Sequence, residues 1–275
     1  MSDVAARWAV RRTMLPLPAP RILVIAAWVT LWWAVVTALH IRPEFLPTPW
    51  EVLRRIALLA VFPIGDGPLW IHVAWSAIRF VLGFLLATVV GLPLGFAMGY
   101  VRRIDWLVTP VFDLLRCVPP IAWAPFALLW FGPSLGAQAF VIFTSALPPI
   151  VLSAERGFRL IDRNLLEAVR SLGARPVTIM WEVAIPSSIP VLVSGLRIGL
   201  ASGWMALVGA EIIAGDGTHS GLGYLILIGQ QTLHADLTIG AMAIIGVLGA
   251  LLDWGLRRAE KRASTWRLVE EGGHG

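Results

Sequence analysis

Hydrophobic residues occur along this chain in long blocks, and short polar segments separate one block from the next. Each block is close to the ~20 residues that a helix needs to cross a bilayer. The blocks cover residues 22–40, 73–99, 107–130, 137–154, 187–213 and 238–257. The pattern therefore predicts an all-α, polytopic membrane protein with about six transmembrane helices.

Positive charge falls in alternate segments between these blocks, which orients the predicted helices. Arginines precede the first block, separate the second from the third and the fourth from the fifth, and follow the sixth. The segments 131–136 and 214–237 carry none, and the arginines of 41–72 are offset by acidic residues. Because basic segments stay in the cytoplasm, both termini are expected inside. We expect a cytoplasmic N-terminal segment at 1–21, a transmembrane domain at 22–257 and a cytoplasmic tail at 258–275. Within the transmembrane domain, a cytoplasmic loop is expected at 155–186.

The composition excludes several other classes of protein. Hydrophobic residues make up 57% of the chain and charged residues 14%, against about 25% charged in an average soluble domain. The net charge of +5 comes almost entirely from arginines scattered between the blocks, whereas a nucleic-acid-binding protein gathers them on one face. Cys117 is the only cysteine, which excludes an intrachain disulfide and a multi-thiolate metal site. The first block is long for a signal peptide and is expected to remain as a helix.

Proline and glycine are frequent inside the predicted helices, and two interpretations stay open. These residues are Pro110, Pro119, Pro120 and Pro125, which break up the third block, Gly91, Pro93, Gly95 and Gly99, which interrupt the second, and Pro148 and Pro149 in the fourth. Irregular backbone is tolerated beside a water-filled cavity or a neighbouring helix, which suits a protein that opens and closes. Glycines can instead simply allow two helices to pack closely.

The segment after the first block carries a helix signal of its own. Thr48 can cap a helix and Pro49 suits its first position. Apolar residues follow at helical spacing, at Trp50, Leu53, Ile56 and Ala57. We expect a short amphipathic helix on the membrane surface here.

The segment between the fourth and fifth blocks predicts two short helices that project into the cytoplasm. Asp162 can cap the first helix, Gly173 can end it in a left-handed conformation, and Pro176 can begin the second. Pro186 then begins the next span. Apolar side chains share one face of the first helix, at Ile161, Leu165, Val169 and Leu172. The shape suits a rigid knob that a partner protein binds.

The same segment resembles a motif of the binding-protein-dependent ABC import permeases. That motif reads Glu-Ala-Ala, three residues, Gly, nine residues, and Ile-x-Leu-Pro. Here it stands as Glu167-Ala168-Val169, Gly173 and Val183-Ala184-Ile185-Pro186, with every interval kept and only apolar residues exchanged. Other stretches are similar to the sulfonate, taurine and nitrate importers of this family, at residues 45–49, 118–125, 129–132 and 220–226.

The resemblance implies the ABC type I importer permease fold, in the inner (plasma) membrane of a bacterium. It implies that two permease copies form the pathway for a small organic or inorganic anion, such as a sulfonate, taurine or nitrate. Two cytoplasmic ATPase subunits bind ATP and magnesium and drive transport, and a periplasmic binding protein delivers the substrate. No cofactor is expected in this chain. The residues that the resemblance assigns to ATPase coupling are Glu167, Ala168, Gly173, Ala174 and Pro186.

Ionisable residues inside the blocks are costly and are therefore candidates for function. They are Arg79, Asp113, Arg116, Arg197, Glu211 and Asp253. Asp113 and Arg116 are three residues apart on one helix and can pair. We hypothesise that Arg116 or Arg197 faces the pathway and favours an anion, while a buried structural ion pair is the competing interpretation. The candidates for the translocation pathway are Arg116, Pro119, Pro120, Trp123, Arg197 and Glu211.

Two other classes of function compete with transport driven by an ATPase. An intramembrane enzyme needs a nucleophile beside a base, or a metal site, and none of the five histidines falls in the middle of a block. The chain has no P-loop, so it is not expected to hydrolyse ATP itself. A secondary transporter or channel without an ATPase stays open as the alternative, although the internal repeat common in such carriers is not evident.

Overall fold

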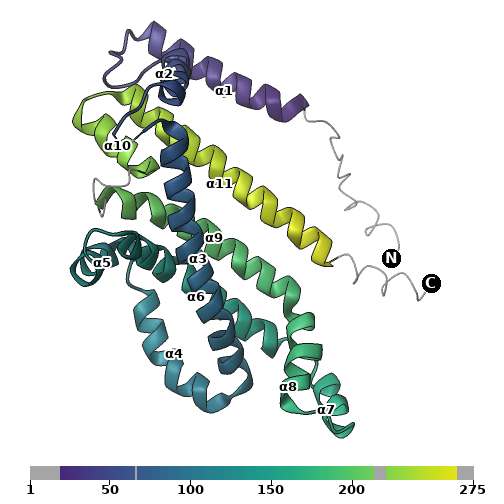
Figure 1. Cartoon of the computed structure of the whole chain (residues 1–275). Helices are drawn as coiled ribbons and strands as arrows, with labels where there is room; N and C mark the ends of the chain where they lie inside the picture. The colour runs from purple at the N-terminus through teal and green to yellow at the C-terminus, as the bar shows by residue number, and fades with distance from the viewer. Residues whose placement is uncertain (1–18, 66, 214–220, 265–275) are drawn as a thin grey trace, which may run out of the picture.

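The computed structural model describes residues 19–65, 67–213 and 221–264, which are helical without a β-strand (Figure 1). The long helices are α1 (Ala19–Ala38), α3 (Leu69–Tyr100), α6 (Leu135–Arg159), α9 (Ile185–Ile213) and α11 (Ala235–Ser264). The shorter ones are α2 (Pro49–Val61), α4 (Arg102–Arg116), α5 (Ala124–Phe131), α7 (Arg163–Ser171), α8 (Pro176–Thr178) and α10 (Leu222–Gln231), with a 3₁₀ turn η2 (Pro120–Trp123) and a π-helical segment η3 (Ile179–Ala184). The all-α prediction is confirmed. Most of the expected segments 1–21 and 258–275 lies outside the described residues.

Four helical segments are long and apolar enough to cross a membrane. They are Leu69–Tyr100, Leu135–Arg159, Ile179–Ile213 and Ala235–Arg258, and they match the second, fourth, fifth and sixth predicted spans. The apolar part of α1, Leu23–Ala38, is shorter than these. The described residues thus hold four spans, or five if a bent helix pair is counted as one, so the prediction of six is not confirmed.

The bent pair occupies the third predicted span, 107–130, which we expected prolines to break up. The segment Arg102–Arg116 and the segment Pro120–Phe131 meet at 92°. Consecutive prolines, Pro119 and Pro120, occupy the corner. Proline cannot donate a backbone hydrogen bond and disfavours a helical conformation in the residue before it. The prediction that prolines break up this block is therefore confirmed at Pro119 and Pro120, whereas Pro110 and Pro125 lie within α4 and α5.

Helices α3 and α6 pack closely because α3 presents a stripe of small residues to α6. Gly83, Ala87, Gly91 and Gly95 follow one another at four-residue spacing, and all four are buried. A Cβ atom on Gly83 would lie 2.6 Å from the carbonyl oxygen of Ala139, and one on Gly95 would lie 2.6 Å from Ala154 Cβ. Small residues at this spacing let two membrane helices approach closely. The glycines therefore serve packing, and the interruption expected in α3 is absent.

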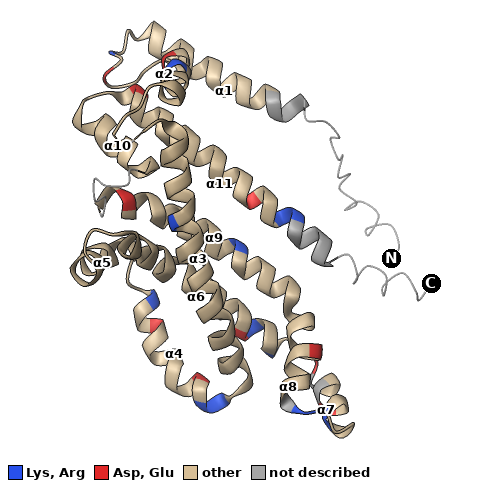
Figure 2. Ribbon diagram, viewed as in Figure 1, with Lys and Arg blue, Asp and Glu red and all other residues tan. Residues whose placement is uncertain are grey.

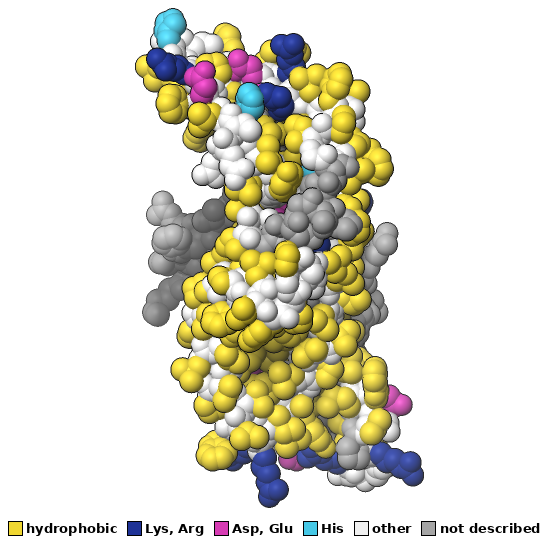
Figure 3. Space-filling model, turned by 60° about the vertical axis from the view of Figure 1, so that its left-hand side comes forward, with side chains coloured by type: hydrophobic (Ala, Val, Ile, Leu, Met, Phe, Trp, Pro, Cys, Tyr) yellow, Lys and Arg dark blue, Asp and Glu magenta, His cyan; other side chains and the backbone are white. Residues whose placement is uncertain are grey.

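The central helices α3, α6 and α9 lie side by side, α11 crosses beside them, and the bent α4–α5 segment flanks the other side (Figure 1). Most charged residues lie toward the two ends of this elongated bundle (Figure 2). Hydrophobic side chains cover much of the long middle part of the face that Figure 3 shows. This distribution suits a protein whose middle contacts lipid and whose ends contact water.

The first polar segment contains the helix that its sequence predicts. Helix α2 begins at Pro49, and Thr48 caps it: the backbone N–H of Glu51 donates to Thr48 Oγ1 at 3.3 Å. In return, the backbone N–H of Thr48 donates to Glu51 Oε2 at 2.7 Å. Such a reciprocal capping box satisfies two backbone donors at once. Val52 and Leu59 form the buried side of α2.

Candidate functional site

The segment between α6 and α9 forms a small knob at one end of the bundle (Figure 1). Asp162 Oδ1 accepts a hydrogen bond from the backbone N–H of Asn164 at 2.9 Å, and α7 follows. Gly173 has a φ of 78°, and its N–H donates to the carbonyl of Arg170 at 2.9 Å. The predicted cap and the predicted left-handed turn are both confirmed.

A short elbow connects this turn to α9 and anchors the knob to the bundle. It consists of α8, which begins at Pro176 as predicted, and η3. Helix α9 then begins at Ile185, one residue before the predicted Pro186. Within the elbow Ile179 and Ala184 are buried, and Ala184 packs in one hydrophobic cluster with Phe96 of α3. The knob is therefore connected to the core through packed side chains.

The outer side of the knob is exposed and partly apolar. Glu167, Ala168 and Gly173 are exposed, whereas Ala174 and Pro186 are half-buried. Exposed apolar residues surround them, with Leu172 at 87%, Val177 at 68% and Leu165 at 44% of their accessible area. Ile161, which we expected on the same apolar face, is instead buried against the bundle. Apolar side chains gathered in this way mark surfaces that bind other proteins.

Arg116 lies at the end of α4, immediately before the bend. Its Nε donates to Asp113 Oδ1 at 2.8 Å, as the spacing of the two residues predicts. Both side chains keep about half of their exposure, 42% and 46%. In the bend Pro119 is exposed and Pro120 half-buried, and Trp123 packs its ring against the rings of Phe126 and Phe140.

Arg197 connects α9 to α11. Its Nε donates to Asp253 Oδ1 at 2.7 Å, and the other oxygen of Asp253 pairs with Arg257. The Arg197 and Asp253 side chains are 35% and 30% exposed. One carboxylate thus accepts hydrogen bonds from two guanidinium groups.

Glu211 lies in a buried polar network that the sequence did not predict. Arg79 Nη1 donates to Glu211 Oε1 at 2.9 Å, and the two side chains are 2% and 1% exposed. Ser76 Oγ donates to the same oxygen at 2.6 Å. The backbone N–H of Gly223 donates to Glu211 Oε2 at 2.8 Å. The network joins α3, α9 and the start of α10.

The sequence held one indirect signal for this network, the glycines at the start of α10. A Cβ atom on Gly221 would contact the Glu211 carboxylate and lie 2.6 Å from Arg79 Nη1. A Cβ atom on Gly223 would lie 2.7 Å from Glu211 Cβ. The pairing itself could not be found, because 132 residues separate Arg79 from Glu211.

The predicted site residues therefore fall into separate places. Of the predicted coupling residues, Glu167, Ala168, Gly173 and Ala174 lie in the knob and Pro186 lies at the start of α9, whereas Arg116, Pro119, Pro120 and Trp123 follow one another through the bend. Arg197 and Glu211 lie on one helix, about 21 Å apart along its axis, and belong to different ion pairs. Within the described ranges no group of three or more His, Cys, Asp or Glu could hold a metal ion.

Comparison with known proteins places this arrangement among transport proteins. A family described as "Binding-protein-dependent transport system inner membrane component" matches residues 81–265. The taurine transport system permease protein TauC of Escherichia coli is 35% identical over 244 residues, or 88% of this chain and 87% of the relative. The bicarbonate transport system permease protein CmpB of Synechococcus elongatus is 31% identical over 216 residues, or 76% of this chain and 77% of the relative.

A solved structure supports the fold independently. An inward-facing structure of the MetNI methionine ABC transporter contains a chain that superimposes with a TM-score of 0.57 at 21% sequence identity. The match covers 80% of this chain and 99% of that chain. At 21% identity, this similarity shows a shared fold, that of an ABC importer permease.

Proposed function

Because this chain belongs to the family of binding-protein-dependent inner-membrane transport components, and is the permease subunit of an ABC importer, we propose that its α7 knob docks a separate ATPase. Such permeases are transport subunits and not enzymes, and the family implies an ATPase and a substrate-binding protein as partners.

The exposed apolar residues of the knob support this docking more than any other observation. Leu165, Leu172 and Val177 are exposed although they lie beyond the candidate spans Leu135–Arg159 and Ile179–Ile213. Lipid does not contact residues outside a span, so we expect another protein to bury these apolar side chains. The exposed Glu167 carboxylate would offer a charge-assisted contact to a basic group of the ATPase.

The anchoring of the knob supports a mechanical role. The elbow packs into the bundle through Ile179 and Ala184. A rigid-body movement of a docked ATPase would therefore be transmitted to α9 and α3 through packed side chains. In this proposal ATP and magnesium bind the ATPase, and this chain needs no cofactor of its own.

The substrate that we propose is a small anion. Taurine and bicarbonate, which the names of two relatives specify, both carry an anionic group. Arg116 and Arg197 are the candidates to attract it. We also propose that two permease copies surround the pathway and that both termini lie in the cytoplasm. The chain would then consist of an N-terminal segment at 1–21, a permease domain at 22–257 with its coupling loop at 155–186, and a tail at 258–275.

Affinity purification tests the docking surface. The tagged chain is co-expressed with the ATPase of its transporter, and the amount of ATPase that co-purifies is measured. Leu172→Asp should reduce that amount about tenfold or more, because a central apolar contact of a protein interface is worth roughly 2 kcal/mol. Phe45→Asp is the matched control, since Phe45 is also exposed but belongs to the segment between α1 and α2, which lies at the opposite end of the bundle (Figure 1). Equal ATPase yields from the two variants would refute docking at the knob.

A further inference from the structure

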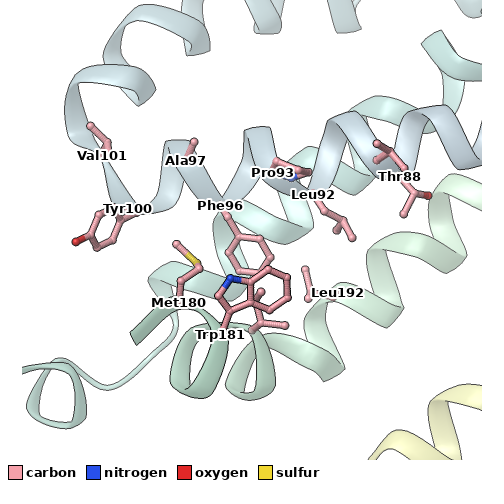
Figure 4. Close-up of a pocket in the computed structure, with 12 residues that line it drawn as sticks. Thr88, Leu92, Pro93, Phe96, Ala97, Tyr100, Val101, Met180, Trp181 and Leu192 are labelled. Carbon is pink, nitrogen blue, oxygen red and sulfur yellow. The ribbon is translucent and has the colours of Figure 1, made fainter. Parts of the chain in front are cut away.

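An apolar groove with a volume of about 680 Å³ runs between α3 and the elbow that carries the knob. Figure 4 shows Leu92 and Phe96 of α3 on one side and Met180 and Trp181 of the elbow on the other. Tyr100 lies at one end of the groove (Figure 4). None of the residues that line the groove is charged.

The groove is long enough to hold a lipid tail of one membrane leaflet. It follows α3 from Thr88 to Val101, which is about 20 Å of helix at 1.5 Å per residue. One leaflet contributes about half of the ~30 Å hydrocarbon core. Both bordering segments, Leu69–Tyr100 and Ile179–Ile213, are candidate membrane spans. The groove therefore exceeds the depth of about 15 Å that one leaflet contributes, and it is long enough to hold a lipid tail of that leaflet.

The end of the groove at Tyr100 is positively charged. A second hollow of about 520 Å³ shares Tyr100 with the groove and is lined by Arg102, Asp105 and Arg159. Arg159 is held by Asp105 at 2.6 Å and by Glu155 at 3.0 Å.

Arg102 and its neighbour Arg103 differ from Arg159 in having no such partner. Both are exposed, and neither forms an ion pair within the described residues. Arg102 thus provides a guanidinium group without an ion pair where the apolar groove reaches the membrane surface, and Arg103 adds a second positive charge next to it in the chain. This combination complements a molecule with a long apolar tail and a negative headgroup.

We propose that the groove holds one acyl chain of an anionic phospholipid from the cytoplasmic leaflet, with its phosphate beside Arg102 and Arg103. Anionic lipids are concentrated in that leaflet and attract arginines at its surface. A guanidinium group forms charge-assisted hydrogen bonds with phosphate oxygens. The inference uses the orientation proposed above, and it depends neither on the transported substrate nor on ATPase docking.

Native mass spectrometry of the full chain, purified in detergent and mixed with equal amounts of phosphatidylglycerol and phosphatidylcholine, tests the proposal. The wild type should retain phosphatidylglycerol preferentially, by about fivefold for each arginine. The double variant Arg102→Gln/Arg103→Gln should retain the two lipids almost equally. Arg54→Gln removes an exposed arginine of α2 that has no ion pair within the described residues, and it should leave the preference unchanged.

A second variant tests the apolar part of the groove. Ala97 lines it, so Ala97→Trp should fill it and lower the retention of both lipids, whereas Ala57→Trp on the exposed side of α2 should not. An unchanged lipid preference in the double arginine variant would overturn the proposal. A second test uses a variant whose only cysteine lies in the groove, Ala97→Cys with Cys117→Ser. A disulfide between two copies of this variant in membranes would also overturn the proposal, because a second copy of the chain would then cover the groove.

Discussion

Arg79 of α3 donates a hydrogen bond to Glu211 of α9 at 2.9 Å, and both side chains are almost completely buried. The same carboxylate accepts hydrogen bonds from Ser76 Oγ and from the backbone N–H of Gly223. One side chain therefore holds two long helices and the start of α10 together. A buried carboxylate of this kind is tolerated only because its oxygens are fully occupied.

Removing this carboxylate charge should destabilise the protein. Glu211→Gln leaves the Arg79 guanidinium buried without its counter-charge, at a cost of about 3–5 kcal/mol in the free energy of unfolding. Thermal unfolding of the detergent-solubilised chain measures the effect. Glu182→Gln is the control, because Glu182 is exposed. If both variants unfold at the same temperature as the wild type, the network does not stabilise the fold.

The close approach of α10 to this network predicts that position 221 must remain glycine. A Cβ atom there would contact the Glu211 carboxylate and Arg79 Nη1. Gly221→Ala should cost about 1–3 kcal/mol, as overpacked sites do. Gly246→Ala adds the same methyl group in α11, where nothing lies within 4 Å. Thermal unfolding should therefore separate the two variants, and similar midpoints would contradict the prediction.

The left-handed turn of the knob predicts different effects for two substitutions of one residue. Gly173 has a φ of 78°, a conformation that valine adopts only with strain, at roughly 1–2 kcal/mol. Gly173→Val should change the angle between α7 and the elbow and reduce the ATPase that co-purifies with the chain. Asparagine tolerates this conformation, so Gly173→Asn should retain more ATPase than Gly173→Val. Equal ATPase yields from the two variants would exclude a role for the turn geometry.

The paired arginines allow the pathway and ion-pair interpretations to be distinguished by uptake measurements. If Arg116 attracts the anion, Arg116→Gln should lower uptake about tenfold, the effect of one lost charge-assisted hydrogen bond. Asp113→Asn should then preserve uptake, because it frees the arginine from its partner. The same comparison applies to Arg197→Gln and Asp253→Asn. Equal losses in both members of a pair would favour a structural ion pair.

Features that depend on neighbouring residues could be predicted from the sequence. The cap at Asp162, the turn at Gly173 and the start of α2 at Pro49 are all found where the residues indicate them. Each depends on hydrogen bonds or backbone preferences within a few residues. The membrane class follows in the same way, because the hydrophobicity of a segment is a property of that segment alone.

The sequence by itself therefore determined the class of protein, its helical segments and the motif of the knob. Only the tertiary structure decided which helices meet: it paired Arg79 with Glu211 and turned the stripe around Gly91 toward α6. The physical reason is that ion pairs and close packing join residues far apart in the chain. Their partners are set by the arrangement of whole helices and not by the local hydrogen bonds of any one of them.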